Sequence, residues 1–423
     1  MIRSDQHSSR FLLGTVYFIY FFCGMAMCFE GSFNPEFKDY FHLGYQQQQY
    51  TTFAKNIPFA LAIFIGLLIP RIGYKNCLSL AMLLFGVGTL LLIPGLQTGN
   101  YGLILVAFFI LGMGFNFELV AGNPLLSGLG ESAASSSRLN LGNALGAIAQ
   151  IIAPLFLTVI IPASLTTMAS KLPYIEGLFA VIGTILLGIC LLTLLARPVD
   201  ISAGAGAEGA GVRNPAPTRS LWTQPKVMLG FVTIFLVLGA EAGLFGLFRN
   251  YLEDPAVAGL SAHASLTLFT VYFSIFALGR LTGSWVQKRI SPARTLAFSA
   301  VAALLLVGLM AVAKGPLAII SIILLGFFVS IFFPTLYSLA IEGLGDQTAK
   351  ASGLLTMGFL GCAVLPVLQG KVADTVGVQQ SFLTCVIPYL FALFYAVKGC
   401  STGIRRVTEP IPLKQDKYPV ETK

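Results

Sequence analysis

Charged residues are scarce in this chain of 423 amino acids. Asp, Glu, Lys and Arg together account for 10% of the residues, whereas a soluble domain carries about 25%. Hydrophobic residues account for 56%, and the mean hydropathy is +0.82. This composition excludes an ordinary soluble domain and predicts a protein that crosses a membrane many times.

Histidines and paired cysteines are also few. The three histidines, His7, His42 and His263, lie near a chain end or in predicted loops. The seven cysteines form no CxxC pair and fall mostly within or beside apolar runs, which argues against a zinc site or a disulfide framework. The chain has no HExxH segment and no Ser/His/Asp arrangement. We therefore expect no metal, no cofactor and no enzymatic activity, so any proton handling must depend on carboxylates.

Long apolar runs dominate the chain instead. Helices are expected for them, because lipid cannot satisfy an open backbone. The first run has no small-residue cleavage site. We therefore expect it to be retained as a transmembrane helix rather than removed as a signal peptide. The predicted fold is an all-α membrane protein with twelve transmembrane helices, each near the roughly 20 residues needed to cross a bilayer: 11–33, 51–69, 76–94, 101–128, 139–162, 174–196, 227–251, 264–285, 295–313, 316–341, 351–369 and 379–397.

The net charge of +8 has a topological explanation. If both termini are cytoplasmic, most of the 26 Lys and Arg residues lie in cytoplasmic segments. This bias is the positive-inside rule and argues against a nucleic-acid partner. We expect a multi-pass protein of the cell membrane with both termini in the cytoplasm. Only four basic residues then fall in the outer loops: Lys38, Lys171, Lys314 and Lys371.

A Gly/Ala/Pro-rich polar stretch, 197–226, divides the chain and reads as a flexible cytoplasmic linker. The predicted organisation is a six-helix bundle over 1–196, the linker, a second bundle over 227–398 and a cytoplasmic tail over 399–423. The two halves resemble each other, because Gly146 and Gly358 fall eight positions after Arg138 and Lys350. Repeated halves of this kind place a substrate site between them, near the midplane.

One carboxylate, Glu118, interrupts the apolar run 101–131. On a helix it shares a face with Gly114, Ala121 and Gly122, and small residues of this kind face a neighbouring helix. A charged acid at mid-membrane costs roughly 2.5–3.5 kcal/mol on the insertion scale. The cost is tolerable if the acid faces a polar cavity or is protonated. Glu118 is therefore the main candidate for proton coupling.

Other polar residues in apolar runs are further candidates. Glu30 and Asn34 share a face of the first helix, which is expected to stop at Pro35; the alternative is that Glu30 is simply hydrated near the interface. Glu241 lies mid-helix beside Gly239 and Gly243, either as a coupling acid or as a structural hydrogen-bonding group.

The fifth run carries Asn140, Asn143 and Gln150 on one helical face. Amides donate and accept, which suits a polyhydroxylated ligand, although interhelical hydrogen bonding is the alternative. Lys55 is expected to extend to the headgroups rather than to enter the cavity.

Two blocks near the C-terminal end are similar to the fucose–proton symporter family of the major facilitator superfamily: SIFFPTLYSLAIEGLGDQTAKASGLL (Ser330–Leu355) and GCAVLPVLQGKVADTVG (Gly361–Gly377). Shorter motifs resemble the same family, and the last two resemble its glucose/galactose branch: RLNL at Arg138–Leu141, NP at Asn123–Pro124, GAE at Gly239–Glu241 and NYL at Asn250–Leu252.

The resemblance implies two pseudo-repeated bundles, alternating access, and proton- or cation-coupled uptake of a monosaccharide. It carries the family's helix 4 acid to Glu118 and places the helix 1 acid at Cys28, two positions before Glu30. Asn143 matches a sugar-binding glutamine of the family, and Asn123 belongs to the matching NP motif. Tyr272 and Phe333 are expected to stack on the apolar face of the sugar.

Two other functions stay open. Sodium coupling, or efflux of an amphipathic solute, fits the abundance of Phe (34) and Pro70 in the place of the superfamily's usual acidic loop residue. A receptor that binds without translocating is the other, although neither the linker nor the tail has the length of a signalling module. The expected partners are a small sugar, a proton or sodium, and the lipid bilayer, with the protein as a monomer.

Overall fold

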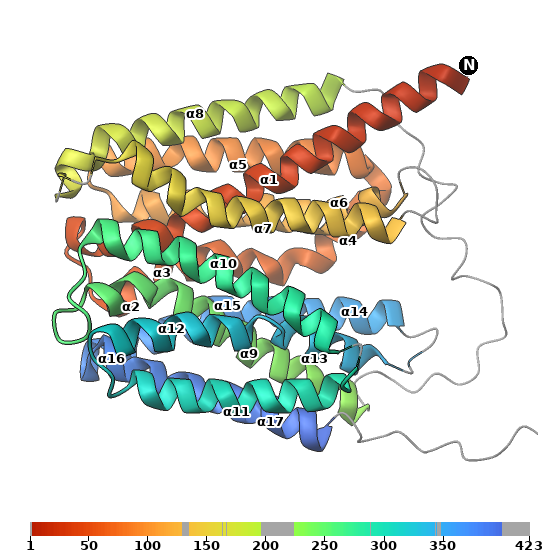
Figure 1. The fold of residues 1–423 in the computed structure, drawn as a ribbon. Coiled ribbons are helices and arrows are strands. Elements are labelled where there is room, and N and C mark those ends of the chain that lie inside the picture. Colours follow the sequence, from red (N-terminus) through yellow and green to blue (C-terminus); the bar gives the residue numbers. More distant parts are fainter. Residues whose placement is uncertain are drawn as a thin grey trace, which may run out of the picture.

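The computed structural model describes residues 2–128, 135–162, 164–165, 167–195, 224–287, 289–342, 344 and 348–399, and these contain helices and no strand. The helices run side by side in two groups, one from each half of the sequence (Figure 1). The first group comprises α1 (Ile2–Tyr40), α2 (Tyr45–Gln48), α3 (Tyr50–Asn56), η1 (Ile57–Leu61), α4 (Ala62–Ile72), α5 (Tyr74–Gln97), α6 (Tyr101–Gly128), α7 (Ser135–Ile160) and α8 (Met168–Leu195).

The second group follows the predicted linker. It comprises α9 (Pro225–Glu253), α10 (Ala262–Val286), α11 (Pro292–Met310), α12 (Pro316–Val329), α13 (Phe332–Ile341), α14 (Thr348–Thr356), η5 (Met357–Leu360), α15 (Gly361–Val376), α16 (Val378–Ser381), η6 (Phe382–Cys385) and α17 (Val386–Val397). Most of the linker (197–226) and all but the first residue of the tail (399–423) lie outside the described residues.

Ten segments of the described chain are long and apolar enough to cross a bilayer, and Ala144–Ile160 is a shorter apolar helix within α7. The remaining predicted crossing, 51–69, falls on α3, η1 and α4, where a 3₁₀ turn interrupts the α-helix. Together these segments match the twelve predicted crossings. The all-α, twelve-helix layout is therefore confirmed.

The first helix does not stop at Pro35, as the sequence suggested, but continues to Tyr40. A proline inside a helix removes one backbone hydrogen bond and costs about 3 kcal/mol in isolation. Here the turn after Pro35 is held by tertiary contacts: the ring of Phe37 is 1% exposed, and Glu36 makes two ion pairs with other helices. Packing therefore outweighs the local tendency to end the helix.

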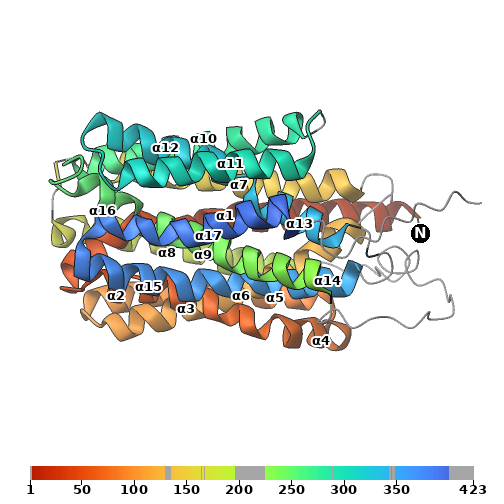
Figure 2. The same ribbon diagram turned by 90° about the horizontal axis from the view of Figure 1, so that it is seen from below.

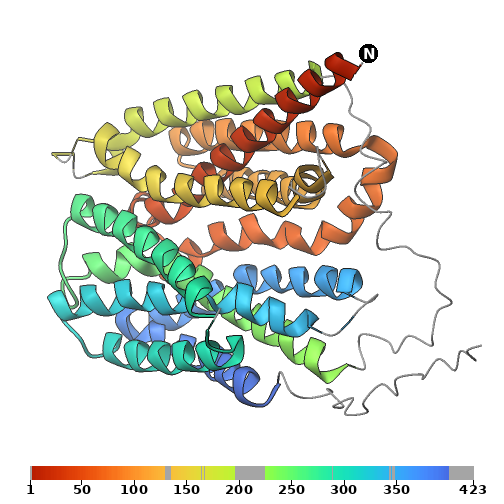
Figure 3. The same ribbon diagram turned by 45° about the vertical axis from the view of Figure 1, so that its right-hand side comes forward.

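The two groups repeat the same packing pattern. α1 packs on α7 in the first group as α9 packs on α15 in the second, and α5 packs on α8 as α11 packs on α17. Figure 3 shows the two groups as separate layers of helices. The repeat seen in the sequence thus corresponds to equivalent helix contacts.

Close glycine contacts make both equivalent interfaces possible. Gly24 of α1 faces Gly146 of α7. A methyl group added at either glycine would meet backbone atoms of the facing helix. In the second group, a methyl group at Gly361 of α15 would overlap the carbonyl of Phe235 in α9. Small residues let transmembrane backbones approach in this way.

Replacement of Gly361 by alanine is expected to separate α15 from α9. Overpacking typically costs 1–3 kcal/mol, so Gly361→Ala should unfold in detergent at a temperature several degrees lower. The matched control is Gly353→Ala, because a methyl group there meets nothing within 4 Å and alanine is the better helix former by roughly 0.5–1 kcal/mol. Equal melting temperatures for the two variants would contradict the close contact.

The halves meet along four sets of contacts. α1 packs on α9, α7 on α10, α15 on α2 and α3, and η1 on η5. Figure 2 shows α15 lying next to α2 and α3. These contacts leave a central space between the halves, in which the candidate site lies.

Candidate functional site

A cavity of about 180 Å³ lies between the two halves. Its walls come from α1, α3, α6 and α7 on one side, and from α9, α10, η5 and α15 on the other. This volume is below the roughly 300–1,000 Å³ of sites that hold drug-sized ligands. The cavity therefore suits a small solute, and it lies where the pseudo-repeat predicted a site.

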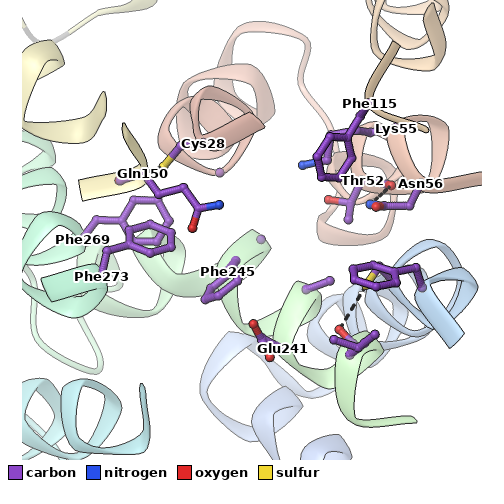
Figure 4. Close-up of a pocket in the computed structure, with 16 residues that line it drawn as sticks. Cys28, Thr52, Lys55, Asn56, Phe115, Gln150, Glu241, Phe245, Phe269 and Phe273 are labelled. Carbon is purple, nitrogen blue, oxygen red and sulfur yellow. Dashed lines mark hydrogen bonds between the residues drawn. The ribbon is translucent and has the colours of Figure 1, made fainter. Parts of the chain in front are cut away.

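Two charged side chains of opposite sign line the cavity: Lys55 of α3 and Glu241 of α9 (Figure 4). The carboxamide of Gln150 in α7 lies between the aromatic wall and the centre of the same space. Asn56, beside Lys55, donates a hydrogen bond of 2.8 Å to the carbonyl of Thr52, which fixes its amide on α3. Together these groups supply donors and acceptors for hydroxyl groups.

Aromatic rings form one wall of the cavity. Phe245 of α9 packs against Phe273 of α10, with ring centroids 5.3 Å apart, and Phe273 packs against Phe269 at 4.8 Å. Figure 4 shows the three rings next to Gln150. An aromatic wall combined with a few polar groups is the usual composition of a small-molecule site.

A second aromatic cluster joins the halves at one end of the cavity. Phe59 of η1 stacks on Phe359 of η5 with centroids 5.2 Å apart, and each ring has one further aromatic neighbour in its own half. These neighbours are Phe115 at 5.8 Å and Phe333 at 5.4 Å. Phe59 follows Asn56 by about one helical turn, so this cluster lies at the end of the cavity away from Tyr45.

Polar contacts join the halves at the opposite end. The amide of Asn34 donates to the carbonyl of Gly246 at 2.9 Å, and Gln48 donates to the same carbonyl and to the side chain of Asn250 at 2.8 Å. The predicted substrate ligand Asn34 is thus engaged between α1 and α9.

One cross-half contact caps a helix. The Asp374 carboxylate accepts hydrogen bonds of 2.5 and 2.9 Å from the backbone N–H groups of Tyr45 and Gln46, at the start of α2. A carboxylate at a helix N-terminus is favourable. This end of the cavity is therefore sealed by directional bonds rather than by apolar packing alone.

A row of four charges extends this seal. Glu36 of α1 pairs with Lys171 of α8 at 2.9 Å and with Arg249 of α9 at 2.6 Å, and Arg249 also pairs with Glu253 at 2.7 Å. The Arg249 side chain is 1% exposed. It also donates to the carbonyl of Ser32 and, at 3.1 Å, to the hydroxyl of Ser265.

Glu118 does not line the central cavity. It is 2% exposed in α6, and its Oε1 atom has no hydrogen-bond partner. Tyr20 and Cys23 of α1 lie within electrostatic range of its carboxyl group. The small residues on its helix face neighbouring helices as expected, because Gly114 lies against α5 and Gly122 against the ring of Tyr20.

The other predicted site residues are dispersed. Tyr272 is fully buried behind the cavity wall, edge-on to Phe245 at 5.7 Å, and its hydroxyl has no partner. Phe333 contacts the cavity only through Phe359. Four predicted residues lie on α1, α6 and α7 with side chains outside the described part of the structure: Glu30, Asn123, Asn140 and Asn143.

The sequence pattern misplaced Lys55 and did not identify Glu36. Lys55 lines the cavity, although it was expected to reach the headgroups. Its position in α3 directly before Asn56 is the signal that could have favoured the cavity. Glu36 was not singled out, because the helix was expected to end at Pro35.

A family model described as Major Facilitator Superfamily matches residues 16–360 and 255–415 of the chain. The chain is 30% identical over 404 residues to the glucose/galactose transporter of Brucella abortus biovar 1 (strain 9-941), covering 94% of this chain and 96% of that protein. It is 26% identical over 336 residues to the L-fucose-proton symporter of Escherichia coli (strain K12), covering 75% and 76%.

Two solved structures share the fold. The E. coli fucose:proton symporter FucP in its outward conformation superposes with a TM-score of 0.62 at 23% identity, covering 92% of this chain and 98% of that chain. A bacterial homologue of the human lysosomal transporter Spinster superposes with a TM-score of 0.73 at 13% identity, covering 92% and 96%.

Proposed function

Because the chain belongs to the Major Facilitator Superfamily, we propose that it carries a monosaccharide of the glucose, galactose or fucose class across the membrane, together with a proton. The fold and the superfamily make it a multi-pass membrane transporter. The sugar and the proton are inferred from relatives named glucose/galactose transporter and L-fucose-proton symporter. The sequence resemblance pointed to the same family.

The observation that supports this proposal best is the composition of the central cavity. A sugar has hydroxyl groups around its edge and an apolar C–H face. The cavity offers Lys55, Glu241 and Gln150 for hydroxyl groups and the rings of Phe245 and Phe273 for the apolar face. Since these residues come from both halves, a bound solute contacts both halves at once.

We assign different tasks to two carboxylates within the helices, Glu241 and Glu118. Glu241 lines the cavity and accepts hydrogen bonds from the solute. Glu118 lies away from the solute, in the contact between α6 and α1, and takes up and releases the proton. The Oε1 atom of the buried Glu118 carboxylate has no hydrogen-bond partner, which makes the charged form costly, so protonation of Glu118 lowers the cost of moving its helix relative to α1. Inward movement of the proton supplies about 2.3 kcal/mol per 100 mV.

The substrate is tested with purified protein in liposomes. Glucose, galactose and fucose are added in turn, with external pH recorded, and a sugar carried with a proton makes the external medium more alkaline. The same sugars are then tested with a sodium gradient at constant pH. Sugar movement that depends on sodium and leaves pH unchanged would favour the sodium-coupled alternative, and absence of any sugar signal would favour an amphipathic solute.

Gln150→Ala should weaken sugar binding without affecting the protein's folding. Loss of one hydrogen bond to a neutral group costs about 1–1.4 kcal/mol, or roughly five- to tenfold in the dissociation constant. The measurement is binding of the transported sugar by calorimetry in detergent. The control is Gln380→Ala, at an exposed position outside the cavity. Unchanged affinity in Gln150→Ala would remove this residue from the site.

The orientation proposed for the protein follows from its basic residues. The linker (197–226) and both termini lie in the cytoplasm, so the seal at Asn34, Glu36 and Arg249 closes the cavity on the outer side. The six-helix bundles over 1–196 and 227–398 then move relative to each other around the cavity, and the protein acts as a monomer.

A further inference from the structure

The row of four charges crosses the boundary between the halves at one ion pair, Glu36–Arg249. Each member of this pair has a second ion partner within its own half: Lys171 for Glu36, and Glu253 for Arg249. We propose that Glu36 and Arg249 form the separable contact of the outer gate, and that Lys171 and Glu253 are positioning residues that hold the two charges when the gate opens. This inference rests on the proposed alternating access but not on the identity of the solute.

The charge balance supports a contact that opens and closes. Glu36 with Lys171 is a neutral pair, and so is Arg249 with Glu253. Removal of one member of a buried ion pair leaves an uncompensated charge and is strongly destabilising. Because each half keeps a neutral pair, separation of Glu36 from Arg249 leaves neither charge uncompensated.

The geometry of the second half points the same way. Arg249 donates to the Ser265 hydroxyl at 3.1 Å, and that hydroxyl contacts the carboxylate of Glu253. Arg249, Glu253 and Ser265 therefore form a closed set within α9 and α10. When the halves separate, the guanidinium of Arg249 keeps its contacts with Glu253 and Ser265. It loses its bonds to the carboxylate of Glu36 and to the carbonyl of Ser32.

The first half shows the matching arrangement. Lys171 is 6% exposed in its side chain and donates to Glu36 at 2.9 Å. Both residues belong to the first group of helices, α8 and α1 respectively. Lys171, which the sequence placed in an outer loop, instead lies in the first turn of α8 and holds the gate carboxylate.

This arrangement predicts that two kinds of substitution have opposite effects. Glu36→Gln or Arg249→Gln removes the contact between the halves, so the outward-open state becomes more populated. Lys171→Gln or Glu253→Gln removes a holding partner, so a gate charge is left without its local pair on opening and the outward-open state becomes less populated. A network that served only the stability of the fold would show no such difference in sign.

The cavity contains a natural reporter for this test. Cys28 lines the central cavity beside Gln150 and is 6% exposed. In a variant where the six other cysteines are replaced by alanine, a membrane-impermeant maleimide is applied to the outer face of oriented vesicles without any sugar. We expect about tenfold faster labelling of Cys28 in Glu36→Gln and about tenfold slower labelling in Lys171→Gln; each factor corresponds to about 1.4 kcal/mol.

The matched control is Asp39→Asn, which removes an exposed carboxylate one turn from Glu36 on the same helix. Labelling in this control should equal that of the parent. In a variant without the native cysteines, a second readout uses spin labels at Thr98→Cys and Ala256→Cys, both at exposed outer positions, where a longer separation reports opening. Shifts of all four variants in the same direction, or none larger than the control, would overturn the gate assignment. Sugar transport does not enter either measurement, so failure here is separate from failure of the proposed function.

Discussion

Glu241→Gln is expected to reduce both sugar uptake and sugar exchange. The carboxylate lines the cavity and is the acceptor that we assign to the sugar. A hydrogen bond to a charged group contributes about 1.5–3 kcal/mol, so its loss should weaken sugar binding roughly 10- to 150-fold. The measurement is binding in detergent together with counterflow in liposomes, where internal sugar exchanges with labelled external sugar without a proton gradient.

The control for this variant is Glu342→Gln, which makes the same change at a side chain that is 67% exposed at the far end of the second group. Binding and counterflow should be unchanged in the control. If Glu241→Gln keeps normal affinity and loses only accumulation, Glu241 is a coupling residue, and its assignment as a sugar ligand is wrong.

The crossings could be predicted from the sequence because each depends on local composition. A run of about 20 apolar residues spans a bilayer whatever its neighbours are, but the helix is interrupted within four of the twelve runs: 51–69, 316–341, 351–369 and 379–397. In the run 51–69 the interruption is the 3₁₀ turn Ile57–Leu61. That turn meets η5 of the other half at the Phe59–Phe359 stack, so its cause is a contact that composition does not reveal.

The site was only partly predictable, because it depends on which helix faces point at one another. Glu241 and Gln150 were correctly recognised as polar residues in apolar helices, and both line the cavity. Asn34 had the same signature, yet it donates to the carbonyl of Gly246 across the halves. A helical face identifies a polar stripe but does not distinguish a ligand contact from a seal.

Charged partners from distant segments were beyond the reach of sequence patterns. Glu36 and Arg249 are separated by 213 positions, and their pairing follows from the approach of α1 to α9. The rule that a proline ends a helix concealed Glu36, since tertiary contacts carry α1 through Pro35. In both cases the structure depends on contacts between helices, which rules based on neighbouring residues in the sequence do not include.

Glu118→Gln is expected to abolish accumulation of sugar while leaving exchange intact. At a membrane potential of 100 mV, proton entry supplies about 2.3 kcal/mol, enough for a roughly fifty-fold sugar gradient in the parent. In Glu118→Gln the internal and external sugar concentrations should become equal. Glutamine reproduces the shape of the protonated acid but cannot release a proton. Because Glu118 does not line the cavity, sugar affinity and counterflow should stay within about twofold of the parent.

The paired variants of Glu118 and Glu241 separate coupling from binding. Glu118→Leu tests whether the carboxyl group serves only the packing of α6 on α1. With one carboxyl oxygen already unpartnered, leucine should fold and melt like the parent, and should fail to accumulate sugar as glutamine does. Normal accumulation in Glu118→Gln would show that the proton is carried elsewhere. Since the carboxylate of Glu241 lines the cavity, coupling would then be assigned to Glu241, and the role of Glu118 would be purely structural.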